Sequence, residues 1–226
     1  MPELQFKSQN KQCGKMELKN QTETTVQLNI FGDIVSDEWG KWSDEDTCPQ
    51  DIADFLKDLG NTDEAELLRS YLHQIELYDA TNREGHAAKV YFNALFGMDF
   101  TRSEENIINA ALNYGYSIIL SAFNREIVAE GYLTQLGIFH DNMFNHFNLS
   151  CDLMEPFRIL IDRKVKSLKL TDFTSEEKYI LVNTLNETVV INQSRQTTLN
   201  AIKHYCRSVF DALNEGDLSL IQFYSL

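Results

Sequence analysis

The chain has 226 residues, of which 43% are hydrophobic and 11% aromatic, which is enough to bury a substantial core in one or two domains. Its formal net charge of −14 argues against a broad phosphate-binding surface, so contact with nucleic acid needs a local basic patch or a basic partner. No segment approaches the roughly 20 apolar residues that cross a bilayer, and the start MPELQFKSQNK is unlike a signal peptide. The cysteines form no CxxC pair, so we expect free thiols and a cytoplasmic location.

The first 61 residues predict a short α/β fragment. Polar and apolar side chains alternate from Thr25 to Phe31, which is the pattern of a β-strand. A short amphipathic helix is expected between Pro49 and Leu59, because proline favours a helix start and apolar residues follow at helical spacing. Gly60 is a typical helix stop and marks the end of the fragment.

From residue 62 onward, apolar residues recur every three or four positions, which predicts a mainly α fold. A β-branched run interrupts this pattern once and predicts a short strand. The expected elements are helices over 63–77, 82–97 and 104–131, a helix through residue 152 towards 169, a strand at 189–191 and a helix over 195–214.

The stretch from Gly137 to Arg158 places one histidine, His140, shortly before a helix with two acids. Asp152 and Glu155 are three residues apart, so they project from the same helical face. An imidazole and carboxylate oxygens that converge in this way can hold a divalent cation. The alternative is a solvated helix face with ordinary hydrogen-bonded partners.

Local chemistry indicates where this helix begins and bends. Asn145, Asn148 and Ser150 are residue types that cap a helix N-terminus. Pro156 lacks an N–H, so the hydrogen bond to the Asp152 carbonyl is missing and a kink beside the acids is expected. The alternative is a proline tolerated near a helix start.

Four stretches carry a specific resemblance: TNREGHAAKVYFNALFG (81–97), INAALNYGYSIILSA (108–122), GYLTQLGIFH (131–140) and FNLSCDLMEPFR (147–158). They resemble the CRISPR-associated spacer-integration nuclease, most closely that of type II-A systems. In that family, the protein is the larger subunit of the adaptation pair that inserts foreign DNA into the CRISPR array. The resemblance implies a helical nuclease or integrase domain over 62–226, in a prokaryotic cytoplasm.

The resemblance also implies one divalent ion, Mn²⁺ or Mg²⁺, with three protein ligands. They match Glu84, His140 and Glu155 here, and Asp152 matches a further acid with a supporting role. The ion is expected to stabilise charge at a scissile phosphate while a DNA 3′-hydroxyl or water attacks.

Basic residues gather just after this motif. They are Arg158, Arg163, Lys164 and Lys166, which are candidates for phosphate contacts. A solvated helix end is the alternative. The partners that the resemblance implies are DNA, the small CRISPR adaptation subunit and full-length integrase subunits, with no membrane.

Residues 1–61 do not match the β-rich dimerisation domain with which that family begins. The segment IFGDIVSDEWGKWSDED instead resembles the start of a Clp-type phage head-maturation protease. The later catalytic motifs of that protease are not found, so protease activity is not expected. Three interpretations follow: a metal-dependent DNA endonuclease or integrase, a non-catalytic decoy that binds CRISPR adaptation proteins, or a misfolded or inert fusion.

Overall fold

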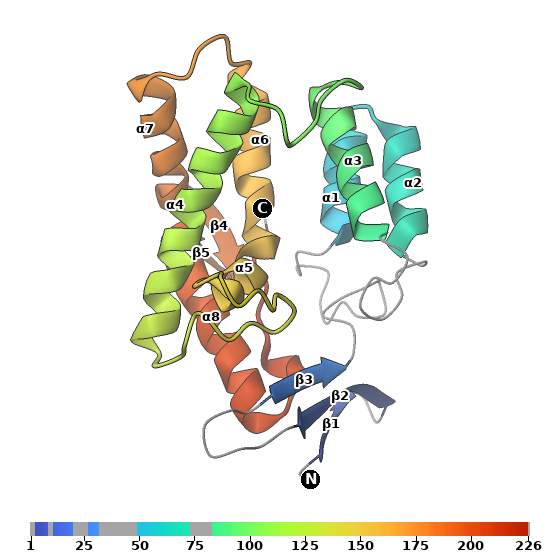
Figure 1. The fold of residues 1–226 in the computed structure, drawn as a ribbon, viewed down its shortest axis with the longest axis vertical. Coiled ribbons are helices and arrows are strands. Elements are labelled where there is room, and N and C mark those ends of the chain that lie inside the picture. Colours follow the sequence, from blue (N-terminus) through green and yellow to red (C-terminus); the bar gives the residue numbers. More distant parts are fainter. Residues whose placement is uncertain (1–2, 9–10, 20–26, 32–48, 73–82, 226) are drawn as a thin grey trace. The chain divides into compact units, whose positions relative to one another are not determined.

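The computed structural model describes residues 3–8, 11–19, 27–31, 49–72 and 83–225, with side chains described over 54–71 and 85–225 (Figure 1). The chain forms two compact units, each described here by itself. Unit 1 comprises residues 1–34, 119–155 and 185–226, and unit 2 comprises 35–118 and 156–184. The fold is mainly helical, as the sequence predicts.

Three N-terminal strands form an antiparallel sheet in the order β1-β2-β3. They are β1 (Glu3–Ser8), β2 (Lys11–Lys19) and β3 (Gln27–Phe31). The predicted strand is confirmed as β3, while its first two residues lie outside the described part of the chain. The sequence analysis missed β1 and β2.

Helices α1 (Pro49–Asp58), α2 (Thr62–Leu72) and α3 (Arg83–Phe96) lie side by side in unit 2 (Figure 1). Their apolar faces bury a common core that also includes Ile159. The members of this core are Phe55, Leu56, Ala65, Leu68, Tyr91, Leu95 and Ile159. The predicted stops are confirmed, because Gly60 and Gly97 have φ of +86° and +109°, which favours glycine. Residues 73–77 of the predicted second helix lie outside the described residues.

The next helices are α4 (Ile107–Ala129), α5 (Asn148–Met154) and α6 (Arg158–Leu168), with the 3-10 helix η2 (Glu155–Phe157) between the last two. Gly115 of α4 lets Ile161 of α6 approach closely, since a Cβ there would clash with the isoleucine side chain. Helix α7 (Ser175–Asn183) was not predicted. Its N-terminus has a capping box between Thr174 and Glu177.

The C-terminal elements belong to unit 1. Strands β4 (Thr188–Ile191) and β5 (Ser194–Thr197) form an antiparallel hairpin that packs against α8 (Thr198–Glu215). Asn192 and Gln193 of the turn both have positive φ, as a tight hairpin turn requires. The predicted strand and last helix are therefore confirmed. The short 3-10 helix η4 (Leu218–Leu220) follows.

A buried carboxylate, Asp162 of α6, links three helices of unit 2. The hydroxyl of Tyr91 on α3 donates to it at 3.0 Å, and the hydroxyl of Tyr116 on α4 donates to its other oxygen. The guanidinium groups of Arg158 and Arg102 lie 4.4 and 5.5 Å from the Tyr116 ring centre. Burial raises the pKa of Asp162 to about 6, although the two phenols and the two arginines oppose this shift.

This raised pKa predicts a defined pH dependence of stability. The folded protein binds the proton more tightly than the unfolded chain, whose ordinary pKa is 3.8. The stabilising contribution is therefore complete below about pH 4 and is lost as pH rises through about 6. As the pH rises from about 4 to above 6, the free energy of unfolding of the native protein should fall relative to that of Asp162→Asn. Urea denaturation measures both values.

The matched control is Asp211→Asn, at an exposed acid of α8. The difference in free energy of unfolding between Asp211→Asn and the native protein should stay nearly constant across the same pH range. A constant difference for Asp162→Asn as well would contradict the prediction.

Candidate metal centre

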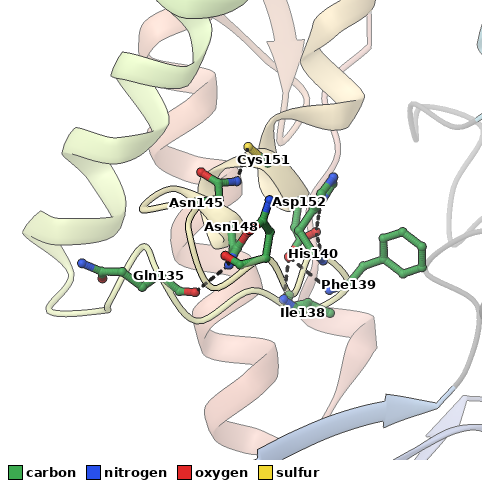
Figure 2. A network of polar contacts seen from close by, with 9 residues as sticks. Gln135, Ile138, Phe139, His140, Asn145, Asn148, Cys151 and Asp152 are labelled. Carbon is green, nitrogen blue, oxygen red and sulfur yellow. Dashed lines mark hydrogen bonds and ion pairs between the residues drawn. The ribbon is translucent and has the colours of Figure 1, made fainter.

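The loop from Gly131 to Phe147, between α4 and α5, carries His140 and folds around one side chain of α5. The carboxylate of Asp152 accepts hydrogen bonds from the backbone N–H groups of Ile138 at 2.5 Å, Phe139 at 3.1 Å and His140 at 3.0 Å (Figure 2). Consecutive N–H groups of this kind form a concave site for an anion. The Asp152 side chain is only 8% exposed, so these donors replace the water it has lost.

The same carboxylate orients the histidine ring. Nδ1 of His140 lies 2.6 Å from Oδ1 of Asp152. Because an ionised carboxylate only accepts, Nδ1–H is the donor, and a neutral imidazole then has its lone pair at Nε2. The His140 side chain is 41% exposed, so this nitrogen belongs to a solvent-accessible ring. Carboxylate–histidine pairs commonly fix metal-binding imidazoles in this way.

Glu155 begins η2, and its backbone N–H donates to the carbonyl of Asp152. Both acids lie near Tyr205 of α8. Burial raises the pKa of this phenol above its ordinary value, and the charges of Cys206, Asp152 and Glu155 raise it further. Glu155 is exposed, whereas Tyr205 is 3% exposed. The negative charges of both acids therefore act on one buried phenol.

The predicted start of this helix is wrong in its detail. The cap position is Phe147, and no side chain makes a capping hydrogen bond. Oδ1 of Asn145 accepts from the Phe147 N–H ahead of the helix, and the Ser150 hydroxyl donates to Asn124. Asn148 is the first helical residue, with its amide directed to the loop.

Helical hydrogen bonding changes at Pro156, as the sequence predicts, while the kink itself stays a prediction. The α-helix gives way to the 3-10 turn Glu155–Phe157 before α6 starts at Arg158. The absent proline N–H explains this change in hydrogen bonding.

The third residue of the predicted ligand set, Glu84, lies on α3, in unit 2. Its side chain lies outside the described side chains, so its part in metal binding stays a prediction. Where side chains are described, no group of three or more His, Cys, Asp or Glu residues is arranged to hold a metal ion.

The four predicted phosphate-binding residues have defined positions in unit 2. The guanidinium groups of Arg158 and Arg163 lie over aromatic rings, at 4.4 and 4.7 Å from the ring centres. Lys166 donates to the carbonyl of Leu95 near the end of α3, and Lys164 is partly exposed. Binding of nucleic acid by this group stays a prediction. None of the described helices is long and apolar enough to span a membrane.

Gly137 was not singled out from the sequence, yet the loop geometry depends on it. A Cβ at this position would clash with the His140 carbonyl oxygen. It would also lie 2.8 Å from Oδ2 of Asp152 and 2.9 Å from Cβ of Asn148. The isolated glycine was the available signal, since glycine often marks a close backbone approach.

The structure thus defines a helical domain in which a carboxylate-bound histidine sits on an interhelical loop. The chain belongs to the family described as CRISPR associated protein Cas1, which matches residues 50–203. The CRISPR-associated endonuclease Cas1 of Neisseria meningitidis serogroup C (strain 8013) is 39% identical over 182 residues, covering 78% of this chain and 59% of the relative. A Cas1 endonuclease of Francisella tularensis subsp. novicida (strain U112) is 30% identical over 131 residues. The match covers 54% of this chain and 40% of that relative.

Solved structures share the fold. A casposase bound to integration product superimposes with a TM-score of 0.59 at 22% identity, covering 76% of this chain and 62% of that chain. A chain of a partial Cas6-RT-Cas1–Cas2 complex gives a TM-score of 0.63 at 17% identity, covering 77% of this chain and 65% of that chain. The chain thus spans about three fifths of the length of its Neisseria relative. The family match begins within the predicted 1–61 fragment; the 61/62 boundary and the protease resemblance stay predictions.

The close approach at Gly137 gives a testable prediction. Gly137→Ala should lower the free energy of unfolding by about 1–3 kcal/mol, because the clash involves backbone and buried side chains with little room to move. It should also shift the His140 ring resonances in NMR spectra. Gln135→Ala, at an exposed side chain of the same loop, is the control and should change neither. An unchanged stability together with unchanged resonances for Gly137→Ala would show that the loop adapts.

Proposed function

We propose that this chain provides a divalent-metal-dependent DNA endonuclease or integrase domain that acts in CRISPR spacer acquisition. The observation that carries the proposal is the His140–Asp152 pair, at 2.6 Å, which fixes one ring nitrogen as a donor. The opposite ring nitrogen is then in the state that binds a metal ion. Glu155 brings a second carboxylate to the same end of α5.

The donor set fits the proposed ion. Carboxylate oxygen suits both Mn²⁺ and Mg²⁺, and a neutral imidazole is the commonest metal-binding side chain. His140 and Glu155 would bind the ion directly, with Glu84 as the third ligand that the family resemblance implies. A bound ion supplies Lewis-acid stabilisation of the charge at a scissile phosphate.

The chain's own residues prepare this chemistry. Asp152 holds the proton at Nδ1 of His140 and keeps the ring from rotating. The backbone N–H groups of residues 138–140 keep Asp152 in place. Attack by water or a DNA 3′-hydroxyl forms the new phosphorus–oxygen bond as the bond to the leaving strand breaks. No protein nucleophile is required.

The comparisons support DNA and adaptation proteins as partners. The Neisseria relative is named as an endonuclease, the casposase was solved with an integration product, and another fold neighbour comes from a complex with Cas2. For this chain we therefore propose DNA as substrate, with the small adaptation subunit as partner and Arg158, Arg163, Lys164 and Lys166 as candidate phosphate contacts.

The direct test is Glu155→Gln, which keeps the side-chain shape and removes its charge. Mn²⁺-dependent cleavage or strand transfer on branched DNA should fall by roughly 100-fold or more, because a ligand of the ion is lost. The dissociation constant for Mn²⁺, measured by electron paramagnetic resonance, should rise in parallel. Glu176→Gln, at an exposed acid of α7, should behave like the native chain.

Equal cleavage by the native chain and Glu155→Gln would remove Glu155 from the metal centre. The decoy alternative gives a different pattern. Neither form would then cleave DNA, and both would bind the small adaptation subunit equally well, which size-exclusion chromatography measures.

A further inference from the structure

The two ends of the segment that carries His140 meet at one buried amide. Nδ2 of Asn148 donates to the carbonyl of Gln135 at 3.1 Å and to the carbonyl of Asn142 at 2.9 Å (Figure 2). These carbonyls lie five residues before the histidine and two residues after it. Asn148 is 3% exposed, so water does not compete strongly for its amide hydrogens. One side chain of α5 therefore closes the segment 135–142 at its base.

Asn148 and Asp152 lie four residues apart on α5 and so share one helical face. Asp152 holds the middle of the segment through the N–H groups of residues 138–140, and Asn148 holds both ends. With the middle contact alone, the loop and the Asp152 side chain could rotate together and carry the imidazole with them. The second contact removes this freedom, because it ties the loop to the helix itself.

Two further observations indicate that this contact is tight. The absent Cβ of Gly137 would lie 2.9 Å from the Asn148 Cβ, so the loop backbone lies directly on this residue. Oδ1 of Asn148 is buried and has no hydrogen-bond partner in the described structure. Rotating the amide by half a turn would point this oxygen at two carbonyls, so the amide orientation is set by its neighbours. A buried unpaired oxygen lowers stability.

We propose that Asn148 is a positioning residue for His140: its amide fixes segment 135–142 on α5, and thereby the direction in which Nε2 of the imidazole points. The inference rests on the proposed function where it concerns metal binding. It assigns Asn148 no contact with the ion or with DNA. It also explains why an asparagine with an unsatisfied oxygen begins a helix that it does not cap.

The test uses the full chain with Asn148→Leu, which keeps the side-chain size and removes both donors. It also removes the unpaired oxygen but leaves the two loop carbonyls without this donor, so the free energy of unfolding should fall. Asn145→Ala is the matched control, because that asparagine is on the same loop but contacts Cys151 and the Phe147 N–H. Long-range ¹H–¹⁵N NMR of the metal-free chain reports the His140 tautomer.

The native chain and Asn145→Ala should show His140 with Nδ1 protonated, and Asn148→Leu should show a mixture of tautomers. Mn²⁺ affinity and Mn²⁺-dependent cleavage should fall about 10- to 100-fold in Asn148→Leu, as for other residues that orient metal ligands. If Asn148→Leu does not fold, Asn148→Ser, which keeps one donor, should show a partial tautomer mixture. An unchanged His140 tautomer in the folded variant would overturn the proposal.

The two proposals fail in different ways. If the native chain cleaves no DNA but Asn148→Leu changes the His140 tautomer, the positioning role of Asn148 is supported and the nuclease function is contradicted. If cleavage requires Mn²⁺ and the His140 tautomer does not depend on Asn148, the nuclease function is supported and the positioning role of Asn148 is contradicted.

Discussion

The buried carboxylate of Asp152 is the contact on which the geometry of the candidate metal centre depends. It receives three backbone N–H groups and the His140 ring. Apolar burial contributes little next to the histidine, because large side chains there face solvent: Phe139 is 58% exposed and Phe144 82%. Figure 2 shows the Phe139 ring directed away from the polar network. Polar contacts to α5 therefore determine where the histidine lies, and the loss of one acceptor affects the whole loop.

The features that could be predicted from the sequence are those with local causes. Gly60 and Gly97 end helices because glycine adopts positive φ readily, and Pro156 breaks a helix because it has no N–H. The shared helical face expected for Asp152 and Glu155 stays a prediction, because Glu155 follows α5 in the 3-10 turn. The capping box at Thr174 is an equally local signal that the sequence analysis overlooked, and with it α7.

Other features could not be predicted because their partners are distant in the sequence or depend on loop conformation. Asp162 meets Tyr91 and Tyr116, which lie 71 and 46 positions earlier, and no periodic pattern links the three. Asparagine is a residue type that caps helices, so the Asn148 side chain was expected to accept a hydrogen bond from a backbone N–H of α5. It bonds backward instead because the loop presents two carbonyls to it. A tertiary contact, rather than local propensity, therefore determines the conformation of this side chain.

The change of helical hydrogen bonding at Pro156 coincides with the division between the two units, since unit 1 ends its middle segment at Glu155 and unit 2 resumes at Pro156. The acid of the proposed centre is thus the last residue before a change of unit. Asp152 anchors the chain before Pro156, and Asp162 anchors it after Pro156 through phenols of α3 and α4. Each carboxylate is buried and each is satisfied by donors from its own unit. Each carboxylate therefore anchors the part of the chain that belongs to its own unit.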